Sequence, residues 1–390
     1  MIDLGHALAG PFAATLLGDF GAEVLKIERP GHGDPMRNLG PRKDGVPLWW
    51  KAAARNKKSV TLDFQSEAGR DLLLRLVRES DVVVESFRPG TLERHDLGWD
   101  VLHEVNPRLV MLRISGFGQT GPGRTRPGFG RIAEAMSGAA HLTGDPDGPP
   151  LHAGYSLADM STGLMGAFGV LLALIGRERD DVGDCIDLAL YEPLFRLIDW
   201  QILFSDQLGT VPVRAGNQFP AILQGVAAGV AESADGVWMS YSAATDSVLA
   251  RLIALVVGDD ALTDPGYATP DARRERVSEV QRRVERWIAE RPAVEIERLF
   301  GERDAVVGRV FDVTAIESDP VYRERGNLIT VPDRDWGEVR MHGVVPRLLG
   351  HPGAVRGVGP DIGEHTREVL EEVAGVETQE LDDLTERAVI

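Results

Sequence analysis

Short runs of β-branched residues alternate with helical stretches along the first 120 residues of this 390-residue chain, and this alternation constrains the fold most strongly. Strand–helix–strand repeats at this spacing are typical of a parallel α/β sheet, because a crossover must return the chain before the next parallel strand. Strands are predicted over residues 2–4, 23–28, 59–64, 81–85 and 109–115, and helices over 12–20, 66–80 and 91–105. Ser66 is expected to cap the second of these helices.

The pattern changes beyond Gly176. The sequence predicts a strand over 185–190, helix over 191–208 and most of 246–299, a strand over 331–345 and a last helix over 363–373. We expect three parts: a large α/β domain over residues 1–205, a smaller helix-rich domain over residues 206–320, and a segment over residues 321–390 that returns to the large domain.

Composition excludes several classes of protein. A single cysteine, Cys185, excludes an intrachain disulfide framework and any multi-cysteine metal site. The longest apolar-rich run, Gly163 to Ile175, is too short to cross a bilayer and predicts a buried helix. The first residues lack the basic and apolar regions of a signal peptide. The expectation is a soluble, cytoplasmic protein that does not act at a membrane.

The charge distribution is uneven. A net charge of −18 argues against a general nucleic-acid binder, because phosphate contacts require a basic face. Residues 26–58 nevertheless contain nine Lys or Arg and three acids. A locally basic segment in an acidic protein suits a small polyanion such as a phosphorylated cofactor, and it suits a solvated loop equally well.

The familiar cofactor and hydrolase motifs are weak or missing. Gly116 to Gly121 has the G-x-G-x-x-G spacing of dinucleotide sites, but Pro122 follows at once and prevents the helix that such a site needs, so a glycine-rich loop is the preferred interpretation. The nine histidines do not pair at metal-binding helical spacing, and no G-x-S-x-G elbow occurs. We therefore predict no metal and no bound organic cofactor.

Asp159 is the most promising candidate for chemistry, because it comes just before a helix rich in Gly, Ala and Leu. Aspartate there is a preferred N-cap, which stabilises a helix by about 1 kcal/mol. The helix dipole would also keep the carboxylate ionised, and an ionised carboxylate can act as a nucleophile. Both interpretations stay open at this point.

Several motifs together resemble the class III CoA-transferases, the family of formyl-CoA and carnitine CoA-transferases and of 2-methylacyl-CoA racemases. They run nearly end to end along the chain: Ala9-Gly10-Pro11, residues 21–30, Gly33-Asp34 with Arg37, residues 56–63 and 84–90, Arg126-Pro-Gly-Phe129, residues 135–138, Ser156-Leu-Ala-Asp159, residues 214–217 and 363–366.

The resemblance implies an α/β fold with a Rossmann-like large domain, a smaller middle domain and an interlocked, ring-shaped homodimer. It also implies that Asp159 attacks an acyl-CoA thioester, so that coenzyme A is a substrate and the second substrate is a carboxylic acid. The CoA-binding positions that it implies are Leu8, Ala9, Arg29, Leu62, Phe87 and Arg94, with Arg37, Arg55 and Lys58 as further candidates. Arginine suits phosphate oxygens because its guanidinium donates in a fixed fork.

The sequence also departs from the family pattern. Racemases of this family carry Gly-His-Asp where this chain has Gly128-Phe129-Gly130, so half of the acid–base pair is missing and racemase activity is disfavoured. Gly130 also replaces an acidic residue of many transferases, and Leu8 stands where formyl-CoA transferase has glutamine. Both changes argue against oxalate–formate chemistry. Two alternatives remain beside the transferase: a racemase or isomerase, and a non-catalytic protein that binds CoA thioesters.

Overall fold

The computed structural model describes residues 1–218 and 226–390, which form two compact units. The first unit comprises Met1–Ala140, His152–Trp200 and Tyr322–Ile390, and the second comprises His141–Leu151 and Gln201–Val321. The chain thus leaves the first unit twice and returns to it for the C-terminal segment. The expected division at residues 205 and 320 stays a prediction about domains.

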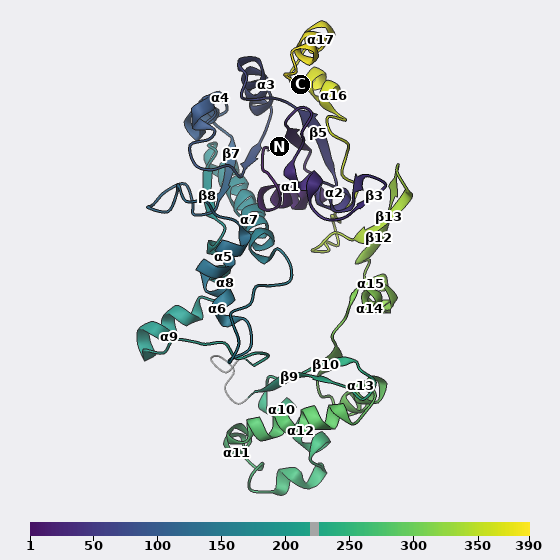
Figure 1. Cartoon of the computed structure of the whole chain (residues 1–390). Helices are drawn as coiled ribbons and strands as arrows, with labels where there is room; N and C mark the ends of the chain where they lie inside the picture. The colour runs from purple at the N-terminus through teal and green to yellow at the C-terminus, as the bar shows by residue number, and fades with distance from the viewer. Residues whose placement is uncertain (219–225) are drawn as a thin grey trace. The chain divides into compact units, whose positions relative to one another are not determined.

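The first unit is built on a six-stranded parallel sheet (Figure 1). The strands of this unit are β1 (Ile2–Asp3), β2 (Val24–Glu28), β3 (Arg42–Lys43), β4 (Val46–Pro47), β5 (Lys57–Thr61), β6 (Val82–Glu85), β7 (Val110–Ser115), β8 (Cys185–Ala189), β12 (Leu328–Asp333) and β13 (Gly337–His342). The order in the sheet is β5-β2-β1-β6-β7-β8, with parallel pairing throughout. When these six strands are numbered in chain order, their order across the sheet is 3-2-1-4-5-6, as in Rossmann-type folds. The predicted parallel α/β sheet is therefore confirmed.

Helices cover both faces of this sheet. The helices of the first unit are α1 (Ala9–Asp19), α2 (Leu48–Ala53), α3 (Glu67–Arg78), α4 (Trp99–Val105), α5 (Gly130–Ser137), α7 (Leu157–Asp180), α8 (Glu192–Leu197), α16 (Thr366–Glu372) and α17 (Thr378–Glu386), with the short 3-10 helices η1 (Pro35–Asn38) and η2 (Glu93–His95). Alternate residues of each strand serve the two faces: Val82 and Val84 pack with α1 and α7, whereas Val83 packs with α3, α4, α16 and α17. This two-residue period gives the sheet two hydrophobic cores.

The second unit has a three-stranded antiparallel sheet in the order β11-β10-β9. Its elements are α9 (Trp200–Leu208), β9 (Ala227–Glu232), β10 (Trp238–Ala243), α10 (Asp246–Val256), η3 (Asp259–Thr263), α11 (Pro270–Glu275), α12 (Val277–Ala289), α13 (Ala293–Glu302), β11 (Val307–Arg309) and α14 (Val313–Ser318), while α6 (Ala139–Leu142) and α15 (Pro320–Glu324) fall where the chain passes between units. Tyr241 and Phe300 lie in its buried core.

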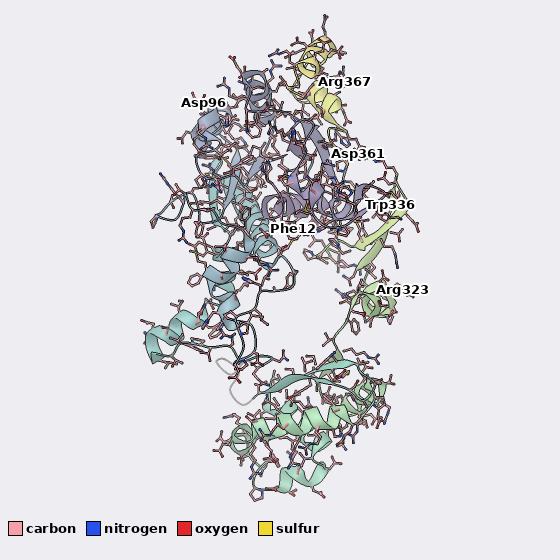
Figure 2. The ribbon with its side chains drawn as sticks, viewed as in Figure 1. Phe12, Asp96, Arg323, Trp336, Asp361 and Arg367 are labelled. Atoms are coloured by element: carbon pink, nitrogen blue, oxygen red, sulfur yellow. The ribbon has the colours of Figure 1, made fainter. Side chains whose placement is uncertain are left out.

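Local geometry corrects several predicted elements. Ser66 caps α3 as expected, accepting a hydrogen bond from the Gly69 amide (3.1 Å). The predicted helix over 91–105 is instead η2 followed by α4, because Asp96 adopts a left-handed conformation (φ 53°) between them (Figure 2). The predicted strand over 331–345 is a hairpin of β12 and β13, since the Asp333 carboxylate accepts from the Asp335 and Trp336 amides and turns the chain. The predicted helix over 191–208 is divided into α8 and α9.

The prediction of a buried helix over 163–175 is correct for one face of the helix and wrong for the other. These residues lie within α7, which packs against α1 and β7 with its small residues, including Gly163, Gly166 and Ala167. The opposite face of α7 exposes large apolar side chains: Leu164, Phe168, Leu171, Leu172 and Ile175. By length and composition alone α7 could also cross a membrane, a weak indication because helices of soluble proteins pass the same criterion.

Candidate active site

Most of the predicted CoA-binding residues lie beyond the carboxyl ends of the parallel strands, with Ala9 at the start of α1, Arg94 in η2 and the others in loops. Leu8 and Ala9 follow β1, Arg29 follows β2, Leu62 follows β5, and Phe87 and Arg94 follow β6. Parallel strands place their carboxyl ends at the same edge, so these six residues share it. The strand order reverses between β1 and β6, and the crevice outside that point is where open α/β sheets bind ligands.

Phe87 connects two of these loops. Its ring meets the ring of His6 edge-on, with centroids 4.8 Å apart, and it contacts Phe64 at 5.8 Å. His6 precedes Leu8 by two residues, and Phe64 follows Leu62 by two. Phe87 and Leu8 are half-buried, whereas Ala9 and Leu62 are buried in the core.

Arg29 and Arg94 are both exposed. Arg94 donates a hydrogen bond to the Thr91 hydroxyl (3.3 Å). Within residues 1–218 and 226–390, neither guanidinium has a carboxylate partner. Both cations are therefore available to a ligand, although no contact joins either one to Asp159.

Six of the other eight cations of residues 26–58 are arranged differently, and Arg42 and Lys43 are the two exceptions. Lys26, Arg37, Lys51, Arg55, Lys57 and Lys58 all form ion pairs with carboxylates, at N···O distances of 2.5–2.9 Å. Arg37 pairs with Glu28, Arg55 with Asp19, and Lys58 with Glu23 and Glu368. Carboxylates therefore neutralise Arg37, Arg55 and Lys58 in this structure, and a contact of these three residues with CoA stays a prediction.

Asp159 lies in the first turn of α7, and Ser156 occupies the N-cap position. The N-cap interpretation of Asp159 is therefore wrong. Its carboxylate lies directly against the first residue of α5: a Cβ atom placed on Gly130 would be only 2.5 Å from Asp159 Oδ2. The absence of a side chain at Gly130 leaves the space that the carboxylate occupies.

The surroundings of Asp159 make its carboxyl group less acidic. Burial raises its pKa above the usual range, and the nearby Glu134 carboxylate raises it further. Glu134 is 2% exposed and lies on α5 one turn after Gly130. It accepts hydrogen bonds from His152 Nδ1 (2.9 Å) and from the Ala153 amide (3.2 Å).

Helices α1 and α7 approach closely beside this carboxylate. A Cβ on Gly163 would lie 2.7 Å from the ring of Phe12 and 2.9 Å from the Ala9 carbonyl oxygen (Figure 2). Met160, next to Asp159, and Leu8 both line a cavity of about 130 Å³. The cavity is largely apolar, and its lining also includes Phe12, Leu16, Trp49 and Val345.

A family model described as CoA-transferase family III matches residues 1–366. The chain belongs to CoA-transferase family III. It is 41% identical to the succinyl-CoA–D-citramalate CoA-transferase of Chloroflexus aurantiacus, covering 100% of this chain and 96% of that protein. The beta subunit of the succinyl-CoA–L-malate CoA-transferase of the same organism is also 41% identical, with the same coverage.

More distant relatives include a formyl-CoA:oxalate CoA-transferase of Rhodopseudomonas palustris, which is 30% identical over 96% of this chain and 92% of that protein. Among solved structures, a CaiB/BaiF family protein from Brucella suis superposes with a TM-score of 0.82 at 29% identity, covering 95% of this chain and 97% of that one. The family and the α/β fold implied by the motifs are thus confirmed.

The glycine-rich loop of this CoA-transferase is not a helix start. Gly118 and Gly121 adopt positive φ angles (82° and 78°), and the next helix begins only at Gly130. The backbone amide of Gln119 donates a hydrogen bond to the Asp187 carboxylate (2.8 Å), and this contact holds the loop against β8. Within the described parts of the chain, no group of three or more His, Cys, Asp or Glu residues is placed to hold a metal ion.

Sequence reasoning missed Glu134 as a neighbour of the candidate nucleophile, His152 as a partner of Glu134, and Met160 as part of the cavity lining. Glu134 is separated from Gly130 by four residues, a spacing that places both on one face of α5. That spacing would have pointed to Glu134 only if the contact between Gly130 and Asp159 had been known. The likeness to the racemases, whose acid–base histidine lies in the run that corresponds to residues 128–130, was the one sequence signal that placed this segment near Asp159.

Proposed function

We propose that this family III CoA-transferase moves CoA from an acyl-CoA thioester to a free carboxylic acid through covalent intermediates on Asp159. The Asp159 carboxylate attacks the thioester carbonyl, the C–S bond breaks, and an acyl–aspartyl anhydride forms as CoA thiolate leaves. The thiolate then attacks the aspartyl carbonyl, which releases the donor acid and leaves CoA as a thioester on Asp159. The acceptor carboxylate then attacks the aspartyl thioester, which releases CoA thiolate and forms a second anhydride. The thiolate attacks the acceptor's carbonyl in this anhydride, which forms the product thioester and regenerates the Asp159 carboxylate.

The observation that carries this proposal is the position of Asp159, a half-buried carboxylate against the start of α5 beside the cavity that Leu8 lines. Among the described residues, the amides of Gly130 and Arg131 donate no hydrogen bond within the chain. These amides are suited to stabilise the oxyanion of the tetrahedral intermediate. A raised pKa also suits a carboxylate nucleophile, because the more basic oxygen attacks more readily.

We propose that the CoA portion lies along the carboxyl edge of the sheet. Exposed Arg29 and Arg94 would bind phosphate oxygens, since neither is neutralised by a carboxylate among the described residues. Leu8, Ala9, Leu62 and Phe87 would contact the less polar parts of CoA.

We propose succinyl-CoA as the donor and a 2-hydroxydicarboxylic acid as the acceptor. The support is the identity of 41% to the citramalate and malate transferases, compared with 30% to a formyl-CoA:oxalate enzyme. The largely apolar cavity beside Met160 would accommodate the methyl and methylene groups of such acids better than it would oxalate.

We also propose that the protein acts as a homodimer in which a second copy covers the apolar face of α7. Leu164, Phe168, Leu171, Leu172 and Ile175 are each about half exposed or more. A contiguous apolar face of this kind on a soluble protein marks an interaction surface.

Mass spectrometry of the intact protein tests the proposed chemistry. After incubation with succinyl-CoA, we expect an adduct that maps to Asp159 and disappears with hydroxylamine. Asp159→Asn should form no adduct while it still binds CoA. Exchange of solvent deuterium at the acyl α-carbon without any acceptor acid would instead support a racemase, and CoA binding without adduct or turnover would support a non-catalytic binding protein.

A further inference from the structure

The loop between β1 and α1 is held in a strained conformation by side chains rather than by backbone pairing. Ala7 has a φ of 60°, in the left-handed region that residues with a side chain disfavour. The amides of Gly5, His6 and Ala7 donate to Asp3 Oδ1 (2.9 Å), Ser86 Oγ (2.7 Å) and Asp34 Oδ1 (3.1 Å). Three separate segments of the chain therefore fix three consecutive amides.

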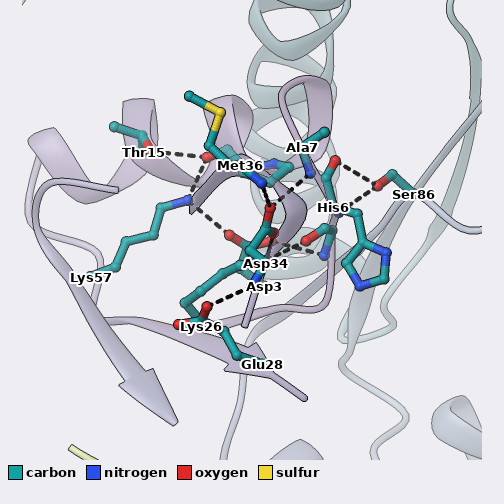
Figure 3. Close-up of polar contacts among 12 residues, drawn as sticks. Asp3, His6, Ala7, Thr15, Lys26, Glu28, Asp34, Met36, Lys57 and Ser86 are labelled. Carbon is teal, nitrogen blue, oxygen red and sulfur yellow. Dashed lines mark hydrogen bonds and ion pairs between the residues drawn. The ribbon is translucent and has the colours of Figure 1, made fainter. Parts of the chain in front are cut away.

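Asp34 and Lys26 pair with each other and both bind the backbone of this loop (Figure 3). The Asp34 carboxylate receives the Ala7 amide and the Met36 amide (2.7 Å). Lys26 Nζ forms an ion pair with Asp34 Oδ2 at 2.8 Å and donates to the Gly5 carbonyl oxygen. Both side chains are 1% exposed, so water does not compete for these contacts.

Further buried charges anchor the pair to the sheet. The Asp34 amide donates to Glu28 Oε2 (2.8 Å), and Glu28 in turn pairs with Arg37. Lys57 Nζ lies 2.8 Å from Asp3 Oδ2 and donates to the Pro11 carbonyl oxygen (2.6 Å) in α1. The cluster thus contains three carboxylates and three cations, and it joins β1, β2 and β5 to the loop and to the first turn of α1.

The two members of the central pair keep their charges. Burial alone would lower the pKa of Lys26, but the carboxylates of Asp3 and Asp34 reverse this and raise it. Burial would likewise raise the pKa of Asp34, yet Lys26 and the Met36 amide hold it below its usual value. A buried ion pair of this kind is weak evidence for stability, because desolvation offsets much of the attraction.

We propose that Asp34, with Lys26 as its counter-ion, is a positioning residue that holds the loop so that the start of α1 faces the CoA thioester. This inference rests on the proposed function. Downstream of the held amides, the amides of Leu8, Ala9 and Gly10 have no partner among the described residues. Their direction is set by the Ala7 conformation, which depends on the hydrogen bond to Asp34.

The test compares Asp34→Ala with Asp333→Ala. Asp333 is a matched control, because it also accepts two backbone amides and pairs with a lysine, Lys51, at 2.8 Å, but it lies in the β12–β13 turn. Asp34→Ala should weaken CoA binding at least tenfold by calorimetry and raise KM for succinyl-CoA more than it lowers kcat. It should also speed amide hydrogen exchange in residues 4–10. Asp333→Ala should leave the CoA affinity and KM within twofold of the wild-type values.

A second substitution separates positioning from stability. Ala7→Gly removes the steric penalty of the left-handed conformation, so Asp34→Ala/Ala7→Gly should regain at least threefold of the lost CoA affinity without a higher melting temperature. Lys26→Met/Asp34→Asn keeps an acceptor for the Ala7 amide without leaving Lys26 unpaired, and it should bind CoA within about threefold of wild type. If Asp34→Ala does not fold, Lys26→Met/Asp34→Ala, which leaves neither member of the pair charged, carries the same expectation.

The possible failures are distinguishable. Wild-type protein that neither binds CoA nor forms an adduct with succinyl-CoA would overturn the proposed function and this inference with it. Wild-type protein that does both, while Asp34→Ala binds CoA like Asp333→Ala, would overturn this inference alone. No recovery with Ala7→Gly, or a Lys26→Met/Asp34→Asn protein as weak as Lys26→Met/Asp34→Ala, would also overturn it.

Discussion

Gly130→Ala is expected to separate catalysis from stability in this CoA-transferase. The added methyl carbon would lie 2.5 Å from Asp159 Oδ2 and 3.2 Å from Asp159 Cγ. The carboxylate must then retreat by about 1 Å to restore an ordinary van der Waals distance. A displacement of this size between reacting groups costs about 100-fold in rate, or about 2.7 kcal/mol of transition-state stabilisation.

The effect on folding should be small, because two contributions oppose each other. Alanine in place of glycine in a helix stabilises by about 0.5–1 kcal/mol. Moving Asp159 away from its preferred rotamer costs about 0.5–1.5 kcal/mol. The net change in the free energy of unfolding should therefore stay within about 1 kcal/mol, which urea denaturation can measure.

The assay is the initial rate of CoA transfer from succinyl-CoA to D-citramalate or L-malate, measured together with adduct formation on Asp159. Gly301→Ala in α13 is the matched control, because no atom lies within 4 Å of the added methyl group there. We expect the rate to fall only in Gly130→Ala, with CoA affinity retained in both variants. A Gly130→Ala enzyme with unchanged unfolding free energy and a rate within twofold of wild type would refute this account of how the nucleophile is placed.

Three further predictions concern other parts of the site. Because the Glu134 carboxylate raises the pKa of Asp159, and the nucleophile must be ionised, Glu134→Gln should move the acidic limb of kcat/KM to lower pH; a limb that stays in place would contradict this. Arg29→Ala and Arg94→Ala should each weaken CoA binding by about 1–3 kcal/mol in calorimetric titrations, and unchanged affinities would exclude them from phosphate binding. Leu172→Glu on the exposed face of α7 should convert a dimer into a monomer in light scattering, whereas an unchanged mass would place the dimer interface elsewhere.

Local sequence signals were sufficient for the sheet. The β-branched runs at 24–28, 82–85 and 110–115 are strands because each is buried on both faces, and their spacing leaves room for the crossovers that parallel pairing requires. The carboxyl-edge position of Leu8, Leu62 and Phe87 then follows from the order of strands and loops. The resemblance to the family added the expected roles of these residues and of Asp159, because no local pattern says which residues bind CoA or act as a nucleophile.

Long-range pairing was beyond the reach of sequence reasoning. The segment 26–58 is basic in isolation, but Lys57 pairs with Asp3, Lys51 with Asp333 and Lys58 with Glu368, partners that the fold brings from both ends of the chain. The same limit applies to α7. Its composition is apolar on all sides, which predicts burial, and only the structure shows that one face lacks a covering element among the described residues.

The contact between Gly130 and Asp159 gives the departures from the family pattern a physical meaning. An acidic residue at position 130, as in many transferases of this family, would bring a Cβ into the space that the Asp159 carboxylate now fills. In this chain such a residue would force the Asp159 carboxylate into another orientation, and the second carboxylate would repel it. In this chain the buried Glu134, one turn further along α5, supplies negative charge near the Asp159 carboxylate without occupying its space. Charge and shape at Asp159, the proposed nucleophile, are therefore set by different residues of α5, so the pKa of Asp159 and the position of its carboxylate can be altered one at a time.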